Sequence, residues 1–359
     1  MIAARHPVQR PRDARLLVVN WQGAIAHAAR SSLADFLEAG DLVIANDAAT
    51  LPASLHGVHL PSGAPIEVRL AGRSSFAREH LRFSAVVFGA GDWRTRTEDR
   101  PQPPPLVPGD RLALGPLVAI VERMLGHKRL VALKFEGPPD TVWAGVARHG
   151  RPIQYAYLDR TLALWDVWSP IAALPVAFEP PSAGFALDWR FLETLRARGV
   201  EFATITLAAG ISSTGEPALD ARLPFDEPYR VPAATASSIR RTKTKGGRIV
   251  AVGTTVVRAL EHSGGHPGTG VANQRVGPRT RLRVVDAILS GTHEPHESHY
   301  QLLRAFQHDD VLAEAGAALE ASKYRTHEFG DSVLIFFHRP PRRMPSRRHV
   351  YRERSPLGA

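Results

Sequence analysis

The sequence predicts an α/β protein in which an inserted β-barrel domain interrupts the α/β domain. Two observations predict this fold class. Both ends of the chain alternate short apolar runs with amphipathic helical segments, whereas the part between them holds short alternating runs separated by glycines and prolines. We expect three parts: a discontinuous α/β domain formed by 1–57 and 151–337, a β-barrel-like domain at 58–150, and a basic, disordered tail at 338–359.

In the first α/β part, residues 14–20 are typical of a short strand. A capping-box spacing that starts at Ser32 predicts a helix, and Gly40 suits the position just past its end. Residues 42–45 then predict a short buried strand whose carboxyl end carries Asn46 and Asp47.

In the inserted part, six short runs predict strands: IEVRL, LRFSAVVF, RLALG, LVAIVERML, RLVALKF and TVWAGVA. The last part returns to α/β alternation. There we expect strands at 200–210, 248–255, 282–289 and 332–337, and helices from Asp188 to Leu195 and at 231–247, 256–265 and 298–323.

The charge of the chain is concentrated at its ends. The 359 residues carry a formal net charge of +10, but residues 339–359 alone hold seven arginines and one acidic residue. Residues 1–16 hold four arginines and one aspartate, so the body is nearly neutral. Basic terminal arms bind polyphosphates without sequence preference, and a merely solvated, disordered tail is the alternative interpretation.

Composition excludes several classes of protein. The chain has no cysteine, which excludes disulfides, thiol nucleophiles and sites with cysteine-ligated metal. No apolar run is long enough to span a bilayer, and the first residues lack the apolar core of a signal peptide. We expect a cytoplasmic protein with no membrane association, and no obligate protein partner is evident.

The segment RIVAVGTTVVRALE (248–261) is the sharpest local feature. A buried strand leads into Gly253, Thr254 and Thr255, and a helix follows. Ligands favour the carboxyl ends of strands in open α/β sheets, and a helix start offers free N–H groups to an anion. Arg258 lies one turn into this helix. The alternative is a threonine-capped helix with a surface arginine.

Two other places have the same ambiguity. Asp47 could act as a base or bind a ribose hydroxyl, and Asn46 could donate and accept hydrogen bonds, but an Asx turn explains both. Ser182 and Gly184 precede the helix capped by Asp188 and allow close approach of a ligand, or tight packing alone.

The stretch HEPHESHY (293–300) is the most metal-like part of the chain, with three histidines and two glutamates. It does not match the HExxH pattern of zinc proteases, and Pro295 argues against a helix through His293 and His296. A solvated polar loop is therefore the expectation, and no metal is expected.

Seven collinear segments together resemble the S-adenosylmethionine:tRNA ribosyltransferase-isomerase family of the queuosine pathway. They cover nearly the whole chain: AGDLVIANDAATLPASLHG, VERML, PPSAGFALD, LRARGVEFATITL, GGRIVAVGTTVVRALE, VVDAIL with THEP, and YRTHEFGDSVLIF. The resemblance implies an α/β domain with an inserted β-barrel, which agrees with the fold class above.

The resemblance also implies a reaction. Family members transfer and isomerise the ribosyl part of S-adenosylmethionine onto 7-aminomethyl-7-deazaguanine in tRNA, giving epoxyqueuosine, and need no metal. It implies S-adenosylmethionine as co-substrate and tRNA as partner. Residues retained for the donor would be Asn46, Ser182, Gly184, Gly253, Thr254, Thr255 and Arg258. The retained acid/base candidates are Asp47 and His293.

Several polar positions depart from the family pattern. Ala48 and Ala49 stand where the family has a threonine and an arginine, and Ala186 and Ala208 stand where it has histidines. A diverged member would keep the scaffold and alter the site chemistry. Two alternatives to the family reaction follow: the same donor with a small-molecule acceptor, and a non-catalytic RNA-binding protein on the same scaffold.

Overall fold

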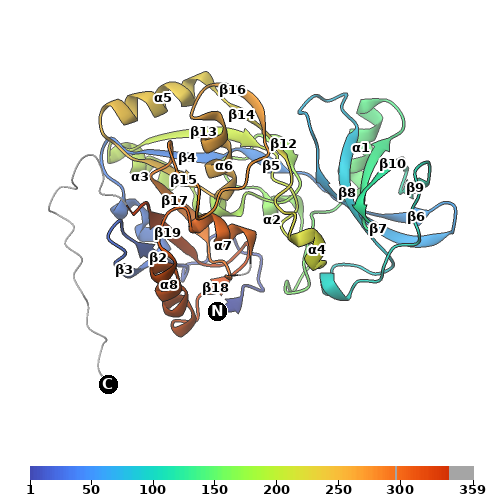
Figure 1. Ribbon diagram of the computed structural model, residues 1–359, viewed down its shortest axis with the longest axis horizontal. Helices are drawn as coiled ribbons and strands as arrows, with labels where there is room; N and C mark the ends of the chain where they lie inside the picture. Colours follow the sequence, from blue (N-terminus) through green and yellow to red (C-terminus); the bar gives the residue numbers. More distant parts are fainter. Residues whose placement is uncertain (296, 339–359) are drawn as a thin grey trace.

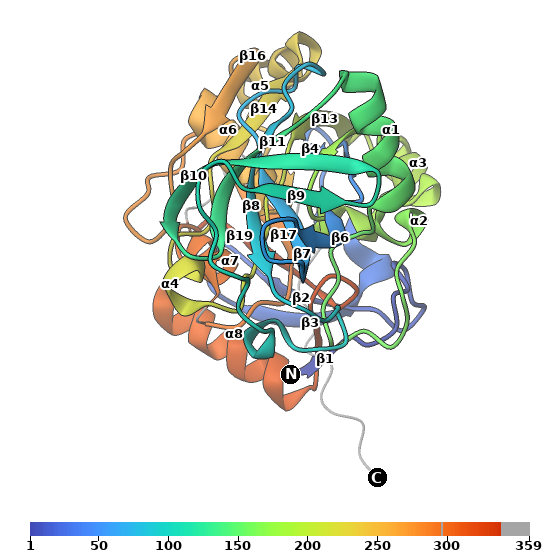
Figure 2. The ribbon, with the colours of Figure 1, turned by 90° about the vertical axis from the view of Figure 1, so that its right-hand side faces the viewer.

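The computed structural model describes residues 1–295 and 297–338. They form a nine-stranded sheet covered by helices and, beside it, a closed six-stranded barrel (Figure 1). Seen from the barrel side, the barrel lies in front of the sheet (Figure 2). The predicted fold class, an α/β domain with a β-barrel, is confirmed. The arginine-rich segment 339–359 lies outside the described residues.

The large sheet has the strand order β16-β14-β13-β4-β15-β17-β19-β2-β3. Its four central strands, β13, β4, β15 and β17, are parallel. The strands are β2 (Arg15–Val19), β3 (Ile25–Ala29), β4 (Leu42–Asn46), β13 (Glu201–Leu207), β14 (Glu227–Val231), β15 (Ile249–Val252), β16 (Gly268–Ala272), β17 (Ala287–Gly291) and β19 (Ser332–Phe336).

Both faces of this sheet are buried, which explains its continuous apolar runs. Along β4, Leu42 and Ile44 belong to one core, and Val43 and Ala45 to the other. The first core contains side chains of α5 (Ala233–Thr244), α6 (Thr254–Ser263), α7 (Ser298–Leu303) and α8 (Asp309–Ala321). The second contains side chains of α3 (Trp189–Ala197) and the 3-10 helix η1 (Arg30–Phe36). None of the helices in the described residues is long and apolar enough to cross a membrane.

The barrel closes in the order β10-β11-β8-β7-β6-β9 around its own apolar core. Its strands are β6 (Ser54–His59), β7 (Ala64–Gly72), β8 (Arg82–Phe88), β9 (Arg111–Leu114), β10 (Leu117–His127) and β11 (Leu130–Phe135). Two short parallel strands, β5 (Ala48–Thr50) and β12 (Leu174–Ala177), pair near the chain crossings between barrel and α/β part.

The run TVWAGVA (141–147) was predicted as a strand, and that prediction is wrong: it lies in α1 (Pro139–His149). Pro139 occupies the start of the helix, where its missing N–H is not needed. Val142, Gly145 and Val146 then share the buried face at helical spacing. A Cβ on Gly145 would stand 2.4 Å from a Leu117 side-chain carbon, so the helix packs directly on the barrel.

Three other element predictions need correction. The helix after Ser32 is the 3-10 helix η1, and the helix expected over 298–323 is divided into α7 and α8. The strand expected over 282–289 begins only at Ala287. The reason is local: the carboxylate of Glu261 accepts the backbone N–H groups of 283–285 at 2.8–2.9 Å, so these groups need no neighbouring strand.

The basic segment 1–16 is not a free arm. Strand β1 (Ile2–Ala3) pairs with β18 (Arg325–Thr326), and Arg15 opens β2. The Arg15 guanidinium forms an ion pair with buried Asp331 at 3.1 Å. The positive charge of Arg15 is therefore paired with a buried carboxylate of the fold.

Gly247, two residues before β15, packs against the backbone of Gly40, and a substitution can test this contact. We expect Gly247→Ala to lower the free energy of unfolding by about 1–3 kcal/mol, because its Cβ would stand 2.0 Å from the Gly40 carbonyl oxygen. The control is Gly316→Ala in α8, where a Cβ meets nothing within 4 Å. It should raise stability by about 0.5–1 kcal/mol, as alanine does in a helix. Urea unfolding measures both, and equal stability of the two variants would contradict the packing.

Candidate active site

The carboxyl ends of the four central parallel strands lie at one edge of the sheet. Asn46 ends β4 and Asp47 follows it, Gly253 follows β15, and His293 lies two residues past β17. The 3-10 turn η3 (Ser182–Ala186) contacts this edge, since a Cβ on Gly253 would lie 3.5 Å from that of Ala183. The strand topology thus places the predicted residues of three segments at the position where open α/β sheets bind ligands.

Asn46 is buried and bonded to backbone groups. Its amide donates to the Leu207 carbonyl at 2.9 Å, and its oxygen accepts from Leu207 N at 3.0 Å and Ala48 N at 3.1 Å. These bonds join the end of β4 to the end of β13. Asn46 therefore positions the strand ends, and its predicted contact with the donor stays a prediction.

Asp47 is half-buried and is held from both sides by hydroxyls. Thr206 donates to one carboxylate oxygen at 2.6 Å and Thr204 to the other at 2.8 Å. These two hydrogen bonds fix the orientation of the carboxylate. An oriented carboxylate at the sheet edge is what a general base requires.

The turn from β15 into α6 is built on Gly253, whose φ is +95°. A glycine adopts this conformation without strain, and α6 can then begin at Thr254. The first N–H groups of α6 have no partner within the helix. The Thr255 Oγ1 atom is also buried and has no hydrogen-bond partner among the described residues. A polar ligand placed here would satisfy both kinds of group.

Arg258 is buried, and its guanidinium points at protein groups. It forms an ion pair with Glu227 and donates to the Ala272 carbonyl at 2.9 Å. Further bonds reach the carbonyls of Phe225 and Gln274. Burial raises the pKa of Glu227, although the charge of Arg258 opposes this. These contacts make Arg258 a positioning residue of α6, and direct contact with the donor stays a prediction.

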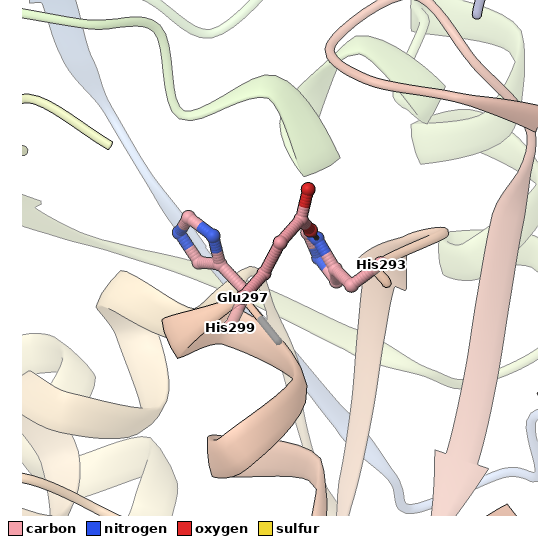
Figure 3. A group of neighbouring side chains, drawn as sticks. All are labelled: His293, Glu297 and His299. Carbon is pink, nitrogen blue, oxygen red and sulfur yellow. Dashed lines mark hydrogen bonds and ion pairs between the residues drawn. The ribbon is translucent and has the colours of Figure 1, made fainter. Parts of the chain in front are cut away.

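His293 lies in a group with Glu297 and His299 (Figure 3). Its Nε2 is 2.9 Å from Ser290 Oγ, and its Nδ1 is 3.2 Å from Glu297 Oε2. The ring of His299 stacks on it at a centroid distance of 4.8 Å. The polar loop predicted here is therefore a structured group at the sheet edge. His296, between these residues, lies outside the described residues.

Two of these groups have shifted pKa values. Burial, helped by the charges of His293 and Arg258, lowers the pKa of His299 to about 4. Burial acts to raise the pKa of Glu297, but the hydrogen bond and charge of His293 outweigh it and lower this pKa. His299 is thus a neutral imidazole and Glu297 a carboxylate at neutral pH.

The predicted Ser182 and Gly184 both lie in η3. Gly184 lies beside Ser169, since a Cβ on Gly184 would be in ordinary contact with the Ser169 Cβ at 3.5 Å. The hydroxyl of Ser169 is itself buried with no hydrogen-bond partner among the described residues. The two alternatives for η3, close approach of a ligand and tight packing alone, therefore both stay open.

The sequence interpretation missed Glu179, which directly precedes the Pro-Pro of this turn. Glu179 is 6% exposed, accepts a hydrogen bond from Tyr155 and accepts the Ser212 N–H at 3.0 Å. Burial raises its pKa to about 7. The available signal was a charged residue placed directly after the buried run VAF. Its partner Tyr155 is 24 residues away, and no local pattern indicates that contact.

Comparison with known proteins identifies the family to which this chain belongs. The family model described as "Queuosine biosynthesis protein" matches residues 1–335. The chain belongs to this family. It is 32% identical to the S-adenosylmethionine:tRNA ribosyltransferase-isomerase of Synechococcus elongatus over 340 residues, which cover 90% of each chain. It is also 32% identical to the protein of that name from Citrifermentans bemidjiense, over 93% of this chain and 96% of the relative.

Among solved structures, this chain is similar to one described as an S-adenosylmethionine tRNA ribosyltransferase from Thermotoga maritima. The sequence identity is 25% and the TM-score is 0.48, with 93% of this chain and 96% of that chain covered.

The buried Glu179 predicts a pH dependence of stability. Its pKa rises from an ordinary 4.5 to about 7 on folding, so the fold favours the protonated acid. The stabilisation is complete below pH 4.5 and is lost as the pH rises toward 7. Relative to Glu179→Gln, the wild type should lose about 3 kcal/mol across this window, at about 1.4 kcal/mol for each pH unit.

Denaturant unfolding at pH 4.5, 6 and 7.5 measures this difference. Glu136→Gln is the control, because Glu136 is an exposed partner of Arg111 on the barrel and should show no such trend. Parallel stability curves for the wild type and Glu179→Gln would refute the raised pKa.

Proposed function

We propose that this protein is an S-adenosylmethionine:tRNA ribosyltransferase-isomerase. The observation that carries the proposal is its membership of the queuosine biosynthesis family, with relatives of that name matched over nine-tenths of both chains. In this reaction the ribosyl part of S-adenosylmethionine moves onto 7-aminomethyl-7-deazaguanine in tRNA and is isomerised, giving epoxyqueuosine. Adenine and methionine leave. Cytoplasmic location stays a prediction.

The donor site we propose is the start of α6. A carboxylate of the donor would accept the free N–H groups of the first turn, where the helix dipole favours a negative charge. The Thr255 hydroxyl, which lacks a partner in the described structure, would be satisfied by the same ligand. Gly253 forms the turn without strain, because its φ of +95° is a conformation that residues with a side chain rarely adopt.

Proton transfer is the chemistry that the protein must supply. The sulfonium acidifies the neighbouring C5′ hydrogens and makes methionine a good leaving group, so a base must take a proton while the acceptor amine is held close. Asp47 has the geometry of that base, since two threonine hydroxyls orient its carboxylate at the sheet edge. His293 is the second acid/base candidate, two strands away across β15.

The two alternatives raised by the sequence are a small-molecule acceptor and a non-catalytic RNA-binding protein. No observation on the described residues favours either one. The acceptor assay below separates all three.

The first functional prediction concerns turnover. The purified protein with S-adenosylmethionine and tRNA carrying 7-aminomethyl-7-deazaguanine should release adenine and increase the mass of the tRNA. Asp47→Asn should lower kcat by about 100-fold or more, the usual contribution of a general base. Asp35→Asn is the control, because Asp35 is an exposed partner of Arg198.

Chromatography measures adenine, and mass spectrometry measures the tRNA. Adenine release with a metabolite but not with tRNA would favour the small-molecule acceptor. RNA binding without any adenine release would favour the non-catalytic protein. Either result overturns the proposal.

The second functional prediction concerns the tail. Deleting 339–359 removes seven arginines and one acidic residue, and should weaken tRNA binding and flatten its dependence on salt. Filter binding at several salt concentrations measures both effects, and turnover at saturating tRNA should be unchanged. Equal affinity of the two chains at low salt would show that the tail takes no part.

A further inference from the structure

Three side chains of metal-ligand type meet next to the sheet edge. His293, Glu297 and His299 each offer one ligand atom, and these atoms all lie within 4.8 Å of one another. Figure 3 shows the Glu297 carboxylate between the two imidazoles. Among the described residues this is the one group of three or more histidines, cysteines or acidic residues with such spacing.

The local fold explains why they meet. His293 follows β17, Glu297 precedes α7, and His299 lies in the first turn of that helix. Helix α7 is anchored because Leu302 and Leu303 are buried in the core of the α/β part. A strand end and a helix start therefore hold the three ligands, and both elements are packed independently of any ion.

The hydrogen bonds around His293 match those of a metal-bound histidine. Ser290 Oγ lies 2.9 Å from Nε2, which fixes the ring and leaves Nδ1 facing Glu297. Metal-binding histidines regularly use their second nitrogen in this way. His299 has its ring stacked on His293, and no protein hydrogen bond occupies its nitrogens among the described residues.

The charge balance also suits a cation. The group offers one carboxylate, that of Glu297, together with two imidazoles. Arg258 is close enough to affect His299, but its charge is compensated by the buried Glu227. The Nδ1 atom of His293 and Oε2 of Glu297 lie 3.2 Å apart, so two potential ligand atoms already face each other.

We propose that His293, Glu297 and His299 bind a divalent transition-metal ion, for which Zn²⁺ is the best-matched probe. Two imidazoles and one carboxylate form a known catalytic zinc set, which leaves a position open to an exchangeable ligand. Bonds of about 2.0–2.2 Å place tetrahedral ligands roughly 3.4 Å apart. His293 Nδ1 and Glu297 Oε2, at 3.2 Å, already have nearly this spacing, and the ion would draw the more widely spaced ligand atoms of the group together.

This inference goes beyond the proposed function, which uses no metal. It also has a consequence for that function. A bound ion would occupy the lone pair of His293, so that proton transfer at the edge would fall to Asp47.

The test is calorimetric titration of Zn²⁺ into the metal-stripped, full-length protein. We expect one equivalent to bind per chain, and visible absorption of a tetrahedral ion when Co²⁺ replaces Zn²⁺. Glu297→Gln and His299→Ala should each weaken binding by at least about 10-fold, with unchanged circular dichroism. His266→Ala, which changes an exposed histidine in the turn after α6, should bind as the wild type does.

Two results would overturn the metal site: no binding of Zn²⁺, Mn²⁺ or Fe²⁺, or equal binding by the Glu297→Gln/His299→Ala double variant. Adenine release is measured in parallel on the metal-free and metal-loaded protein. Turnover without metal binding would refute this inference alone, whereas metal binding without turnover would support it and refute the proposed reaction.

Discussion

The buried ion pair between Arg258 and Glu227 is the interaction on which the site depends. It joins α6 to β14, and Arg258 also donates to the carbonyls of Ala272, the last residue of β16, and of Gln274 beyond it. Glu227 in turn accepts the N–H of Gly210 at 2.8 Å, just past the end of β13. A buried charge without its partner costs several kcal/mol, so these segments must keep their relative positions.

The same pair connects the edge of the sheet to the barrel. Gly210 lies against the barrel strand β7, since a Cβ there would stand 2.9 Å from the Ala71 carbonyl oxygen. The start of α6, the end of β13 and one barrel strand are thus positioned by a single arginine.

The sequence was sufficient for the parts of the fold that depend on local pattern. Buried runs such as 42–45 and 249–252 predict strands because both sheet faces are covered, and Asp188 caps α3 as its spacing indicates. The TVWAGVA run was wrongly predicted as a strand because, over only seven residues, its apolar positions fit both the alternation of a strand and the spacing of a helix. Only its contact with Leu117 in the barrel shows which face is buried.

The candidate site was less predictable for a physical reason. Position after a strand end is a local property, and it placed Asp47, Gly253 and His293 at one edge. The direction of a side chain depends on partners far away in the chain. Arg258 turns inward because Glu227, 31 residues earlier, is buried and forms an ion pair with no other cation among the described residues. The contact between Tyr155 and Glu179 depends in the same way on how the barrel meets the α/β part.

The departures from the family pattern gain a physical meaning at this edge. Ala208, at one of the positions where the resemblance placed a histidine, is fully buried beside the end of β13, so this place no longer offers a polar group. Ala186 ends η3, the turn that contacts Gly253 at this edge. Among the described residues, the imidazoles of His293 and His299 lie at the junction of β17 and α7 together with Glu297. The polar groups of the edge are therefore the carboxylate at the end of β4 and the side chains at the junction of β17 and α7.

The start of α6 lies between these two places, with its free N–H groups and the Thr255 hydroxyl, which has no hydrogen-bond partner among the described residues. A donor bound at α6 would have the hydrogen-bonded Asp47 carboxylate on one side and the imidazole–carboxylate group on the other.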